Sequence, residues 1–278
     1  MRLPNYGIGT YKLEDLATLR KVMNSVLPLG VRLFDTAQFY CNEGLIGEVL
    51  STELPKHGLT REDVLIVSKV HPCNHGYEKA KASTLESVSH FNYIDMMLVH
   101  WPGVSRSQSD NERVDMQAMR AGTWRALEEL LQLGKLRGIG VSNYTVSHLT
   151  ELLEYSTTGP PSVLQSEFHP RCQQAEVWEF CRQHNIQFMG YTPLGRQDLF
   201  NKAIVQDTAA KYGITPSQVL LKWGLQKGAV TIPRSSSPDR NVENATSWTD
   251  GISLAQQDID LLDQLNDDHR YCWNPNLI

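Results

Sequence analysis

Four side chains of different chemistry end or follow short apolar runs in the first part of the chain. Asp35 ends the run LFD, and Tyr40 comes five residues later. Lys69 follows the run that starts at Val64, and His100 follows MLV. Alone, each has an ordinary structural explanation, such as a helix cap or a buried polar side chain. Together, a carboxylate, a phenol, an ammonium and an imidazole are groups suited to general acid–base chemistry.

The apolar runs that precede these residues are short, rich in β-branched residues and nearly continuous. They are Val31–Phe34, Val64–Val67, Ile94–Val99, Leu136–Val141, Ser162–Leu164, Ile186–Met189 and Ala229–Ile232. Continuous apolar runs are typical of strands that are buried on both faces of a parallel sheet. Helical patterns separate them, for example over Thr123–Leu133 and Val146–Leu153, so the sequence predicts an α/β fold.

The polar residues that follow the runs recur at a regular spacing. They are Asp35, Lys69, His100, Ser142, Gln165, Tyr191 and Arg234. Their mean spacing of about 33 residues is one βα unit, and 278 residues hold about eight such units. A doubly wound sheet uses the same units but at this length usually needs a linker or a second domain. We therefore expect a single domain over residues 1–278, a (β/α)8 TIM barrel whose strand ends converge at one mouth.

Composition and charge narrow the class of protein. The chain has a net charge of −5 and 41% hydrophobic residues, and no apolar stretch approaches about 18 residues. No secretion signal is visible at the N-terminus, and the five cysteines form no Cys-x-x-Cys pair. We expect a cytoplasmic protein with no nucleic-acid or membrane partner. Because no exposed apolar stripe is evident, we also expect a monomer.

Three familiar motifs are incomplete. Gly7-Ile-Gly9 and Gly138-Ile-Gly140 lack the third glycine of a Rossmann fingerprint. Tyr77 and Lys81 have the spacing of a short-chain dehydrogenase pair, but no glycine-rich turn precedes them, so a pair on a helix surface is expected. The segment His71–His75 holds three possible metal ligands without a fourth, and we expect no metal.

The reactive residues lie in segments that resemble the aldo-keto reductase family. The segments are FDTAQFYCNE, the lysine in SKV, LVHWPG, GKLRGIGVSN, QSEFHP, GYTPLG and IPRS, and the resemblance runs from about Leu3 to the C-terminus. It implies a TIM barrel that binds NADPH in an extended form and reduces small aldehydes and ketones to alcohols. It also implies a catalytic tetrad, formed by Asp35, Tyr40, Lys69 and His100.

The chemistry of carbonyl reduction assigns these groups their roles. The nicotinamide supplies the hydride, because no side chain can. Tyr40 would donate the proton to the carbonyl oxygen, and the Lys69 ammonium would lower the pKa of this phenol. Asp35 would hold Lys69, and His100 would orient the substrate oxygen. Tyr11 and Trp101 would line the substrate pocket together with Tyr40 and His100.

The resemblance also implies a set of cofactor contacts. They are Thr10, Tyr11, Asp35, Ser142, Asn143, Gln165, Tyr191, Thr192, Leu194, Arg234, Ser235, Arg240, Glu243 and Asn244. Ser142, Asn143 and Gln165 match the positions that hold the carboxamide. Tyr191 matches the ring that stacks on the nicotinamide. Arg234 replaces the more common lysine, and its guanidinium can still bind a 2′-phosphate, which favours NADPH over NADH.

Both ends of the chain are short by comparison with the family. About one strand, near Pro4–Gly9, is available for the hairpin that usually plugs the barrel, so we expect a reduced plug. In the tail, Tyr271 and Trp273 could reach the pocket rim, and its shortness predicts an open pocket with broad substrate tolerance. The polar segment Gly103–Arg120 is expected to be a surface loop near His100.

Two other functional classes were considered. A barrel of this family that only senses its cofactor would turn over weakly, and the intact tetrad argues against it. A hydrolase would need paired carboxylates or metal ligands at the strand ends, whereas Asp35 is the only acid directly after an apolar run.

Overall fold

Parallel strands form the centre of the molecule. In the computed structural model, which describes residues 2–103 and 115–275, eight strands pair in chain order, each parallel to the next. They are β1 (Ile8–Gly9), β2 (Leu33–Asp35), β3 (Leu65–Val70), β4 (Met96–Val99), β5 (Ile139–Ser142), β6 (Val163–Glu167), β7 (Gln187–Tyr191) and β8 (Val230–Thr231). This order confirms the predicted (β/α)8 architecture.

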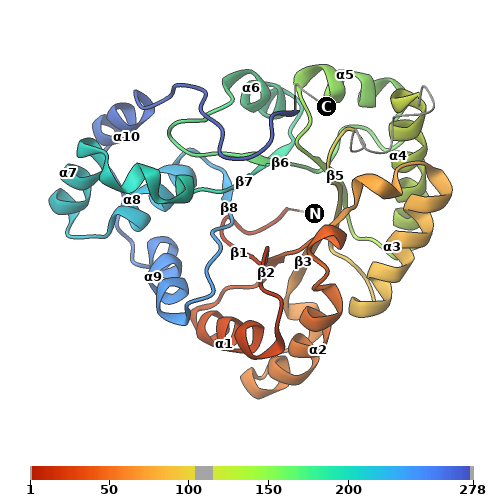
Figure 1. Cartoon of the computed structure of the whole chain (residues 1–278), viewed down its shortest axis with the longest axis horizontal. Coiled ribbons are helices and arrows are strands. Elements are labelled where there is room, and N and C mark those ends of the chain that lie inside the picture. Colours follow the sequence, from red (N-terminus) through yellow and green to blue (C-terminus); the bar gives the residue numbers. More distant parts are fainter. Residues whose placement is uncertain (1, 104–114, 276–278) are drawn as a thin grey trace.

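Helices follow the strands and surround the sheet (Figure 1). They are α1 (Leu16–Val26), α2 (Glu43–Glu53), α3 (Tyr77–Phe91), α4 (Met116–Gln132), α5 (Val146–Tyr155), α6 (Ala175–Gln183), α7 (Ala203–Tyr212), α8 (Pro216–Gln226), α9 (Pro238–Thr249) and α10 (Gln256–Asp263). No helix of the described ranges is long and apolar enough to cross a membrane.

The first and last strands close the sheet on itself. Tyr6 forms a parallel bridge with Thr231, the second residue of β8. The amide of Gly7 donates to the carbonyl of Thr231 at 3.1 Å. The amide of Thr231 donates to the carbonyl of Asn5 at 2.8 Å. Farther along, the amide of Gly9 donates to the carbonyl of Pro233 at 2.9 Å. Because the edges are joined, the carboxyl ends of all the strands meet around one opening.

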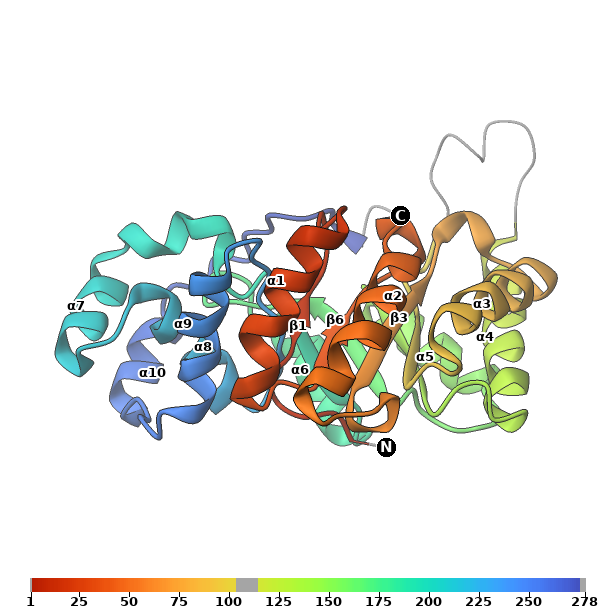
Figure 2. The same ribbon diagram turned by 90° about the horizontal axis from the view of Figure 1, so that it is seen from below.

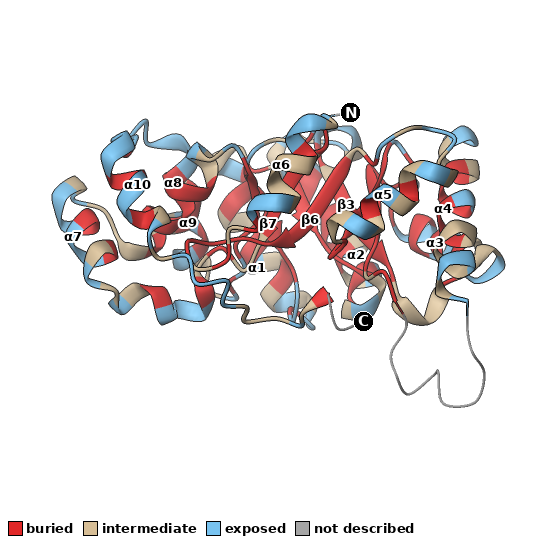
Figure 3. Ribbon diagram, turned by 90° about the horizontal axis from the view of Figure 1, so that it is seen from above, coloured by how far each residue is buried: buried red, intermediate tan, exposed pale blue. Residues whose placement is uncertain are grey.

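The strands are buried on both faces, as their continuous apolar sequences predict (Figure 3). Along β2, Leu33 belongs to a small inner cluster with Val67, Leu98 and Met189, whereas Phe34 belongs to the larger cluster beneath the helices. Neighbouring residues of a strand point to opposite faces, so a strand with no polar face must be covered on both.

The N-terminal segment forms a much reduced plug. Leu3 is buried in the inner cluster, and its backbone N–H and C=O bond the Gln187 side chain, both at 2.8 Å. Gln187 is the first residue of β7, so Leu3 lies at the end of the barrel opposite the strand carboxyl ends. Only Ile8–Gly9 of the expected segment Pro4–Gly9 is a strand, and it is the first strand of the barrel rather than part of a hairpin.

The predicted loop Gly103–Arg120 is only partly open to comparison. Residues 104–114 lie outside the described residues. The prediction is wrong for its last five residues, because α4 begins at Met116, earlier than the predicted start at Thr123. Asp115 caps the helix by accepting a hydrogen bond from the amide of Ala118 at 3.0 Å. Such a cap can start a helix in a segment that has no helical pattern of apolar residues.

One glycine in β5 is required by the close approach of neighbouring strands. A Cβ atom on Gly140 would collide with the carbonyl oxygen of Val163 and come within 2.8 Å of the Leu98 side chain. We expect Gly140→Ala to lower the free energy of unfolding by about 1–3 kcal/mol, measured by urea denaturation. Gly44→Ala on α2 is the matched control, since its nearest contact is an ordinary 3.5 Å. Equal stability of the two variants would contradict this account of strand packing.

Candidate active site

The strand ends bring the four predicted acid–base residues together. Asp35 is the last residue of β2, Lys69 lies one residue before the end of β3, and His100 directly follows β4. Tyr40 ends a short 3-10 helix, Gln38–Tyr40, that leads from β2 into α2. Parallel pairing of β2 with β3 and of β3 with β4 fixes the order of these groups around the opening.

Lys69 is the centre of the cluster. Its ammonium is fully buried and donates hydrogen bonds to Asp35 Oδ2 at 2.8 Å, to the carbonyl of Thr36 at 2.7 Å and to the Tyr40 hydroxyl at 3.2 Å. Gln165 Nε2 donates to the other oxygen of Asp35 at 2.6 Å. All three protons of the ammonium therefore have acceptors, which a buried charge requires.

Burial opposes both charges of this pair. It raises the pKa of Asp35, although the nearby Lys69 ammonium and the Gln165 amide act in the opposite direction. It lowers the pKa of Lys69, and attraction to Asp35 counters that shift. The hydrogen bonds of Lys69 and Asp35 offset the loss of hydration of these two buried charges.

The expected net lowering of the Tyr40 pKa is not seen, because other influences raise this pKa. Burial, followed by the negative charge of Asp35, raises the pKa of Tyr40 well above its ordinary value near 10. Burial is the larger cause, because it disfavours the charged phenolate. In this structure Tyr40 therefore holds its proton firmly at neutral pH, with Lys69 positioned against the oxygen that would carry the charge once the proton leaves.

His100 is an uncharged member of the cluster. Burial lowers its pKa well below the ordinary value of 6.5, and the positive charge of Lys69 adds to this shift. Its ring lies 5.9 Å from that of Tyr40, edge to face. Within the described residues, Nδ1 has no hydrogen-bond partner. A neutral imidazole beside a protonated phenol can donate a hydrogen bond without competing for the proton.

Aromatic rings surround the cluster on its open side. The ring of Tyr11, which is 44% exposed, lies 5.0 Å from that of Tyr40. The stacked rings of Trp101 and His100 are 6.5 Å apart. Sequence reasoning missed Phe39, which is 47% exposed and lies 6.3 Å from His100, and it left open whether Trp273 reaches the rim. Trp273 does so, with its ring 5.8 Å from that of Trp101.

Asn42 is a supporting residue that the sequence did not single out. Its fully buried amide donates to the carbonyls of Thr10, at 2.9 Å, and Leu13, at 3.0 Å, and accepts from the Thr36 hydroxyl at 2.6 Å. It thus ties the loop after β1 to the loop after β2. Its place two residues after Tyr40 was the only signal available, and that spacing alone does not predict a role.

Four of the predicted cofactor residues form one polar group beside the tetrad. Asn143 Nδ2 donates to the carbonyl of His100 and to the Ser142 hydroxyl, both at 3.0 Å, and Tyr191 donates its hydroxyl hydrogen to Asn143 Oδ1 at 2.8 Å. Gln165 joins this group through its backbone carbonyl, which accepts from the amide of Asn143 at 2.9 Å, while its side chain bonds Asp35. Buried amides and a hydroxyl at the ends of β5, β6 and β7 are a donor and acceptor set that fits a carboxamide.

Two predicted residues have an unusual backbone. Asn143 and Thr192, each the first residue after its strand, have φ values of 62° and 53°. Asparagine tolerates this left-handed region, but a β-branched threonine rarely adopts it. Leu194 follows in a turn that leads to the 3-10 segment Gly195–Asn201. Strained backbone is often found where a protein binds a ligand closely.

The predicted adenosine contacts lie after β8 and on α9, on a more open part of the surface. Arg234 and Arg240 are exposed, whereas Ser235 and Asn244 are buried. Glu243 accepts hydrogen bonds from the hydroxyls of Thr215 and Ser217, at 2.7 and 2.6 Å. These residues are thus brought to one region.

Arg234 also makes contacts that the sequence did not predict. Its guanidinium donates to the carbonyls of Tyr11 and Lys12, both at 2.6 Å. Two nitrogen atoms of Arg234 therefore bond the loop after β1, which also carries the predicted cofactor residue Thr10. The hydroxyl of Thr10 in turn donates to the carbonyl of Asp35 at 2.9 Å, so one loop links Arg234 to the tetrad strand.

The residues of two incomplete motifs are bonded elsewhere. Both ring nitrogens of His75 are bonded, to the Thr123 hydroxyl and to the carbonyl of Trp101, and burial lowers the pKa of His75 to about 4. Tyr77 and Lys81 both bond Glu129 on α4. Among residues 2–103 and 115–275, no group of three or more metal-ligating side chains is arranged to hold an ion.

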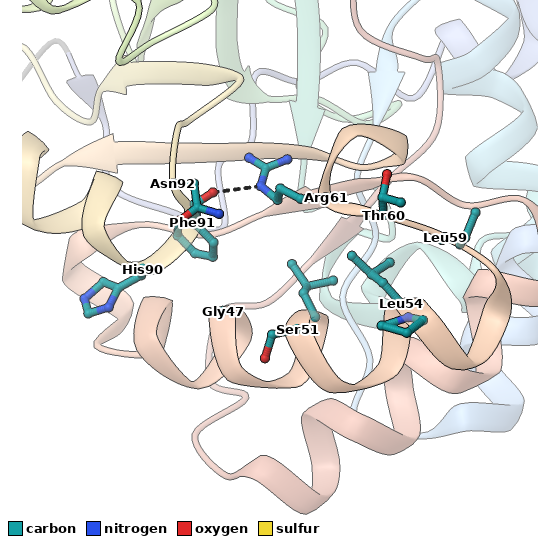
Figure 4. A pocket seen from close by; sticks show the side chains of 11 residues that line it. Gly47, Ser51, Leu54, Leu59, Thr60, Arg61, His90, Phe91 and Asn92 are labelled. Atoms are coloured by element: carbon teal, nitrogen blue, oxygen red, sulfur yellow. Dashed lines mark hydrogen bonds between the residues drawn. The ribbon is translucent and has the colours of Figure 1, made fainter.

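A separate hollow lies between α2 and α3 (Figure 4). It encloses about 150 Å³ and is lined by residues that include Gly47, Leu54 and Phe91. Its one cationic side chain, Arg61, is already bonded to the carbonyl of Phe91 at 3.0 Å and to Asp95 at 2.8 Å. None of the predicted site residues lines it, so the strand-end cluster remains the candidate active site.

Comparison with known proteins agrees with the geometry. The sequence model of the Aldo/keto reductase family matches residues 6–267. The chain is 36% identical to a glyoxal reductase of Bacillus subtilis, covering 99% of this chain and 94% of the relative. It is 35% identical to a 9,11-endoperoxide prostaglandin H2 reductase of Trypanosoma cruzi, covering 99% and 92%.

Solved structures give the same result. An aldose reductase from Schistosoma japonicum superimposes with a TM-score of 0.88 at 27% identity, covering 98% of this chain and 91% of that one. A mutant of Gox0644, crystallised in complex with NADPH, superimposes with a TM-score of 0.86 at 29% identity, covering 99% and 94%.

The buried ion pair predicts an effect on stability. Asp35→Asn leaves the Lys69 ammonium buried without its counter-charge, so we expect the free energy of unfolding to fall by about 3 kcal/mol. Adding Lys69→Met should recover part of that loss, because no unpaired charge remains. Urea denaturation measures both effects.

The control is an exposed ion pair on α6. Glu179 bonds Arg182 at 2.7 Å, and Glu179→Gln should change stability little, since water already screens this pair. If Asp35→Asn were as stable as this control, Lys69 would not depend on Asp35 for its burial.

Proposed function

Because the chain belongs to the aldo/keto reductase family, whose members are oxidoreductases, we propose that it reduces aldehydes and ketones to alcohols with NADPH. The contact of the Tyr40 hydroxyl with Lys69 Nζ, at 3.2 Å, carries the proposal, because it joins a proton donor to a buried cation. A hydride must come from a cofactor, and the site must supply the proton. The four residues of the cluster divide that task.

Tyr40 is the proposed proton donor. Its raised pKa keeps the phenol protonated before reaction, which is the state that a donor needs. Negative charge develops on the substrate oxygen as it is reduced, and the phenol transfers its proton to that oxygen. The phenolate left behind lies beside the Lys69 ammonium, which favours the charged oxygen at the moment when it forms.

His100 and Asp35 are proposed to support this transfer. His100, uncharged and facing Tyr40 across 5.9 Å between ring centres, donates a hydrogen bond to the substrate oxygen and orients it. Asp35 does not act on the substrate, since both of its oxygens are bonded, one to Lys69 and one to Gln165. Its role is to keep the ammonium in place.

The residues beside the tetrad fit a nicotinamide cofactor. Ser142, Asn143 and Gln165 offer buried polar atoms for the carboxamide, and Tyr191 offers its ring as a stacking surface. The bound cofactor supplies the hydride. The exposed guanidinium of Arg234, together with Arg240, offers positive charge for a 2′-phosphate, which supports NADPH over NADH. A relative of known structure was crystallised with NADPH.

Replacing the phenol tests the proton donor. We expect Tyr40→Phe to lower kcat for reduction of benzaldehyde by about 10²-fold or more, because the proton donor is lost. The Kd for NADPH, measured by fluorescence titration, should change little. The matched control is Tyr77→Phe, whose hydroxyl bonds Glu129 far from the cluster and whose loss should leave turnover intact. Near-normal turnover in Tyr40→Phe would remove Tyr40 from this role.

Replacing Arg234 tests the cofactor preference. Arg234→Gln should raise the KM for NADPH by about tenfold or more, the value of one charge-assisted hydrogen bond. The KM for NADH should rise much less. The NADH measurement also controls for the contacts of Arg234 with the loop after β1, since their loss affects both cofactors alike. Equal efficiency of the unaltered enzyme with NADH and NADPH would contradict the proposed 2′-phosphate contact.

A further inference from the structure

Glu167 is a buried carboxylate that the reaction does not use. It is the last residue of β6 and is fully buried. His169 Nε2 lies 2.9 Å from its Oε1. Burial alone would raise the pKa of Glu167, but hydrogen bonds from His169 and from two backbone amides outweigh it and leave this pKa below its ordinary value. A buried carboxylate that stays ionised needs donors fixed around it.

Two of these donors come from the far end of the chain. The amide of Tyr271 donates to Glu167 Oε1 at 2.7 Å, and the amide of Cys272 donates to Oε2 at 3.1 Å. We refer to residues 266–275 as the tail. In Figure 2 the tail crosses the upper face of the barrel, opposite the first residues of the chain. Both carboxylate oxygens of Glu167 thus hold the tail by its backbone.

The tail also has contacts through its side chains. Arg171 pairs with Asp267 and with Asp198, and the Tyr271 hydroxyl donates to Asp198 at 2.6 Å. Asp198 and Asp267 are exposed, and ion pairs to exposed carboxylates contribute little. The Cys272 thiol lies 3.6 Å from the Thr192 hydroxyl and 3.9 Å from the Arg196 guanidinium.

The residue after this attachment reaches the substrate side of the site. Trp273 is 69% exposed, yet its ring lies 5.8 Å from that of Trp101. Trp101 in turn stacks on His100. Within the described residues, the contact with Trp101 is the one ring contact of this largely exposed tryptophan, so its position depends on its backbone. The backbone of the preceding residue, Cys272, is bonded to Glu167.

We propose that Glu167 is a positioning residue, which holds the amides of Tyr271 and Cys272 and thereby sets Trp273 beside Trp101 as an aromatic wall that favours aryl carbonyl substrates. The proposal rests on the proposed carbonyl reductase function. Two indoles give an aryl ring a stacking surface that a two-carbon aldehyde cannot use. Glu167 itself touches no reacting group, so its effect passes through Trp273.

The test measures selectivity rather than activity. The readout is the ratio of kcat/KM for benzaldehyde to kcat/KM for acetaldehyde, with NADPH. Trp273→Ala should lower this ratio about three- to tenfold, the value of one aromatic contact. Glu167→Gln should lower it to a similar extent, because an amide has one acceptor oxygen and cannot satisfy donors at both positions.

A double variant separates positioning from a general structural effect. If Glu167 acts through Trp273, Glu167→Gln should lower the ratio no further once Trp273 is alanine. Multiplicative losses, or an unchanged ratio in Glu167→Gln, would overturn the proposal. Failure of the unaltered enzyme to reduce either aldehyde would instead overturn the proposed function, so the two failures are distinguishable.

A second pair of variants keeps the test available if Glu167→Gln does not fold. Cys272→Pro removes the same amide donor from the tail and leaves the buried carboxylate unchanged. Cys272→Ser, which keeps that N–H group, is its matched control. The proline variant should lower the selectivity ratio and the serine variant should not. Equal ratios in the two variants would contradict a role for the bond between Cys272 and Glu167.

Discussion

The buried ion pair between Lys69 and Asp35 is the constraint on which the site depends. An ammonium with no exposed surface is stable only if each of its protons meets an acceptor, and here the acceptors come from the end of β2, from the loop after it and from Tyr40. Two adjacent strands must therefore keep their parallel register for the charge to be tolerated. The same register places the phenol within hydrogen-bond distance of the cation.

The two ends of the barrel serve different needs. At the end opposite the strand carboxyl ends, the buried Leu3 side chain and the two bonds of the Leu3 backbone to Gln187 form the expected reduced plug. At the other end, polar residues gather at six successive strand ends, and the loops that carry them are joined by buried side chains such as Asn42.

The sequence predicted the strands and the tetrad because both leave local signals: continuous apolar runs, and a reactive residue after each. It failed where the cause lies elsewhere in the chain. The pKa of Tyr40 is raised by burial and by Asp35, and a pair of residue types does not reveal either influence. Glu167 and Trp273 are about a hundred residues apart, and only the closed barrel brings the tail to β6. The first strand was missed as a barrel strand because two residues carry no periodicity.

The way in which the tail is held has a consequence for how this protein can change. Glu167 bonds backbone amides, and every residue except proline has one. The side chains at the tip of the tail are therefore free to vary while its attachment persists. Substitutions at positions 272 and 273 can be explored one at a time, in evolution or in a mutant library, without detaching the segment that displays them. A rigid barrel thus carries a short variable segment at its mouth.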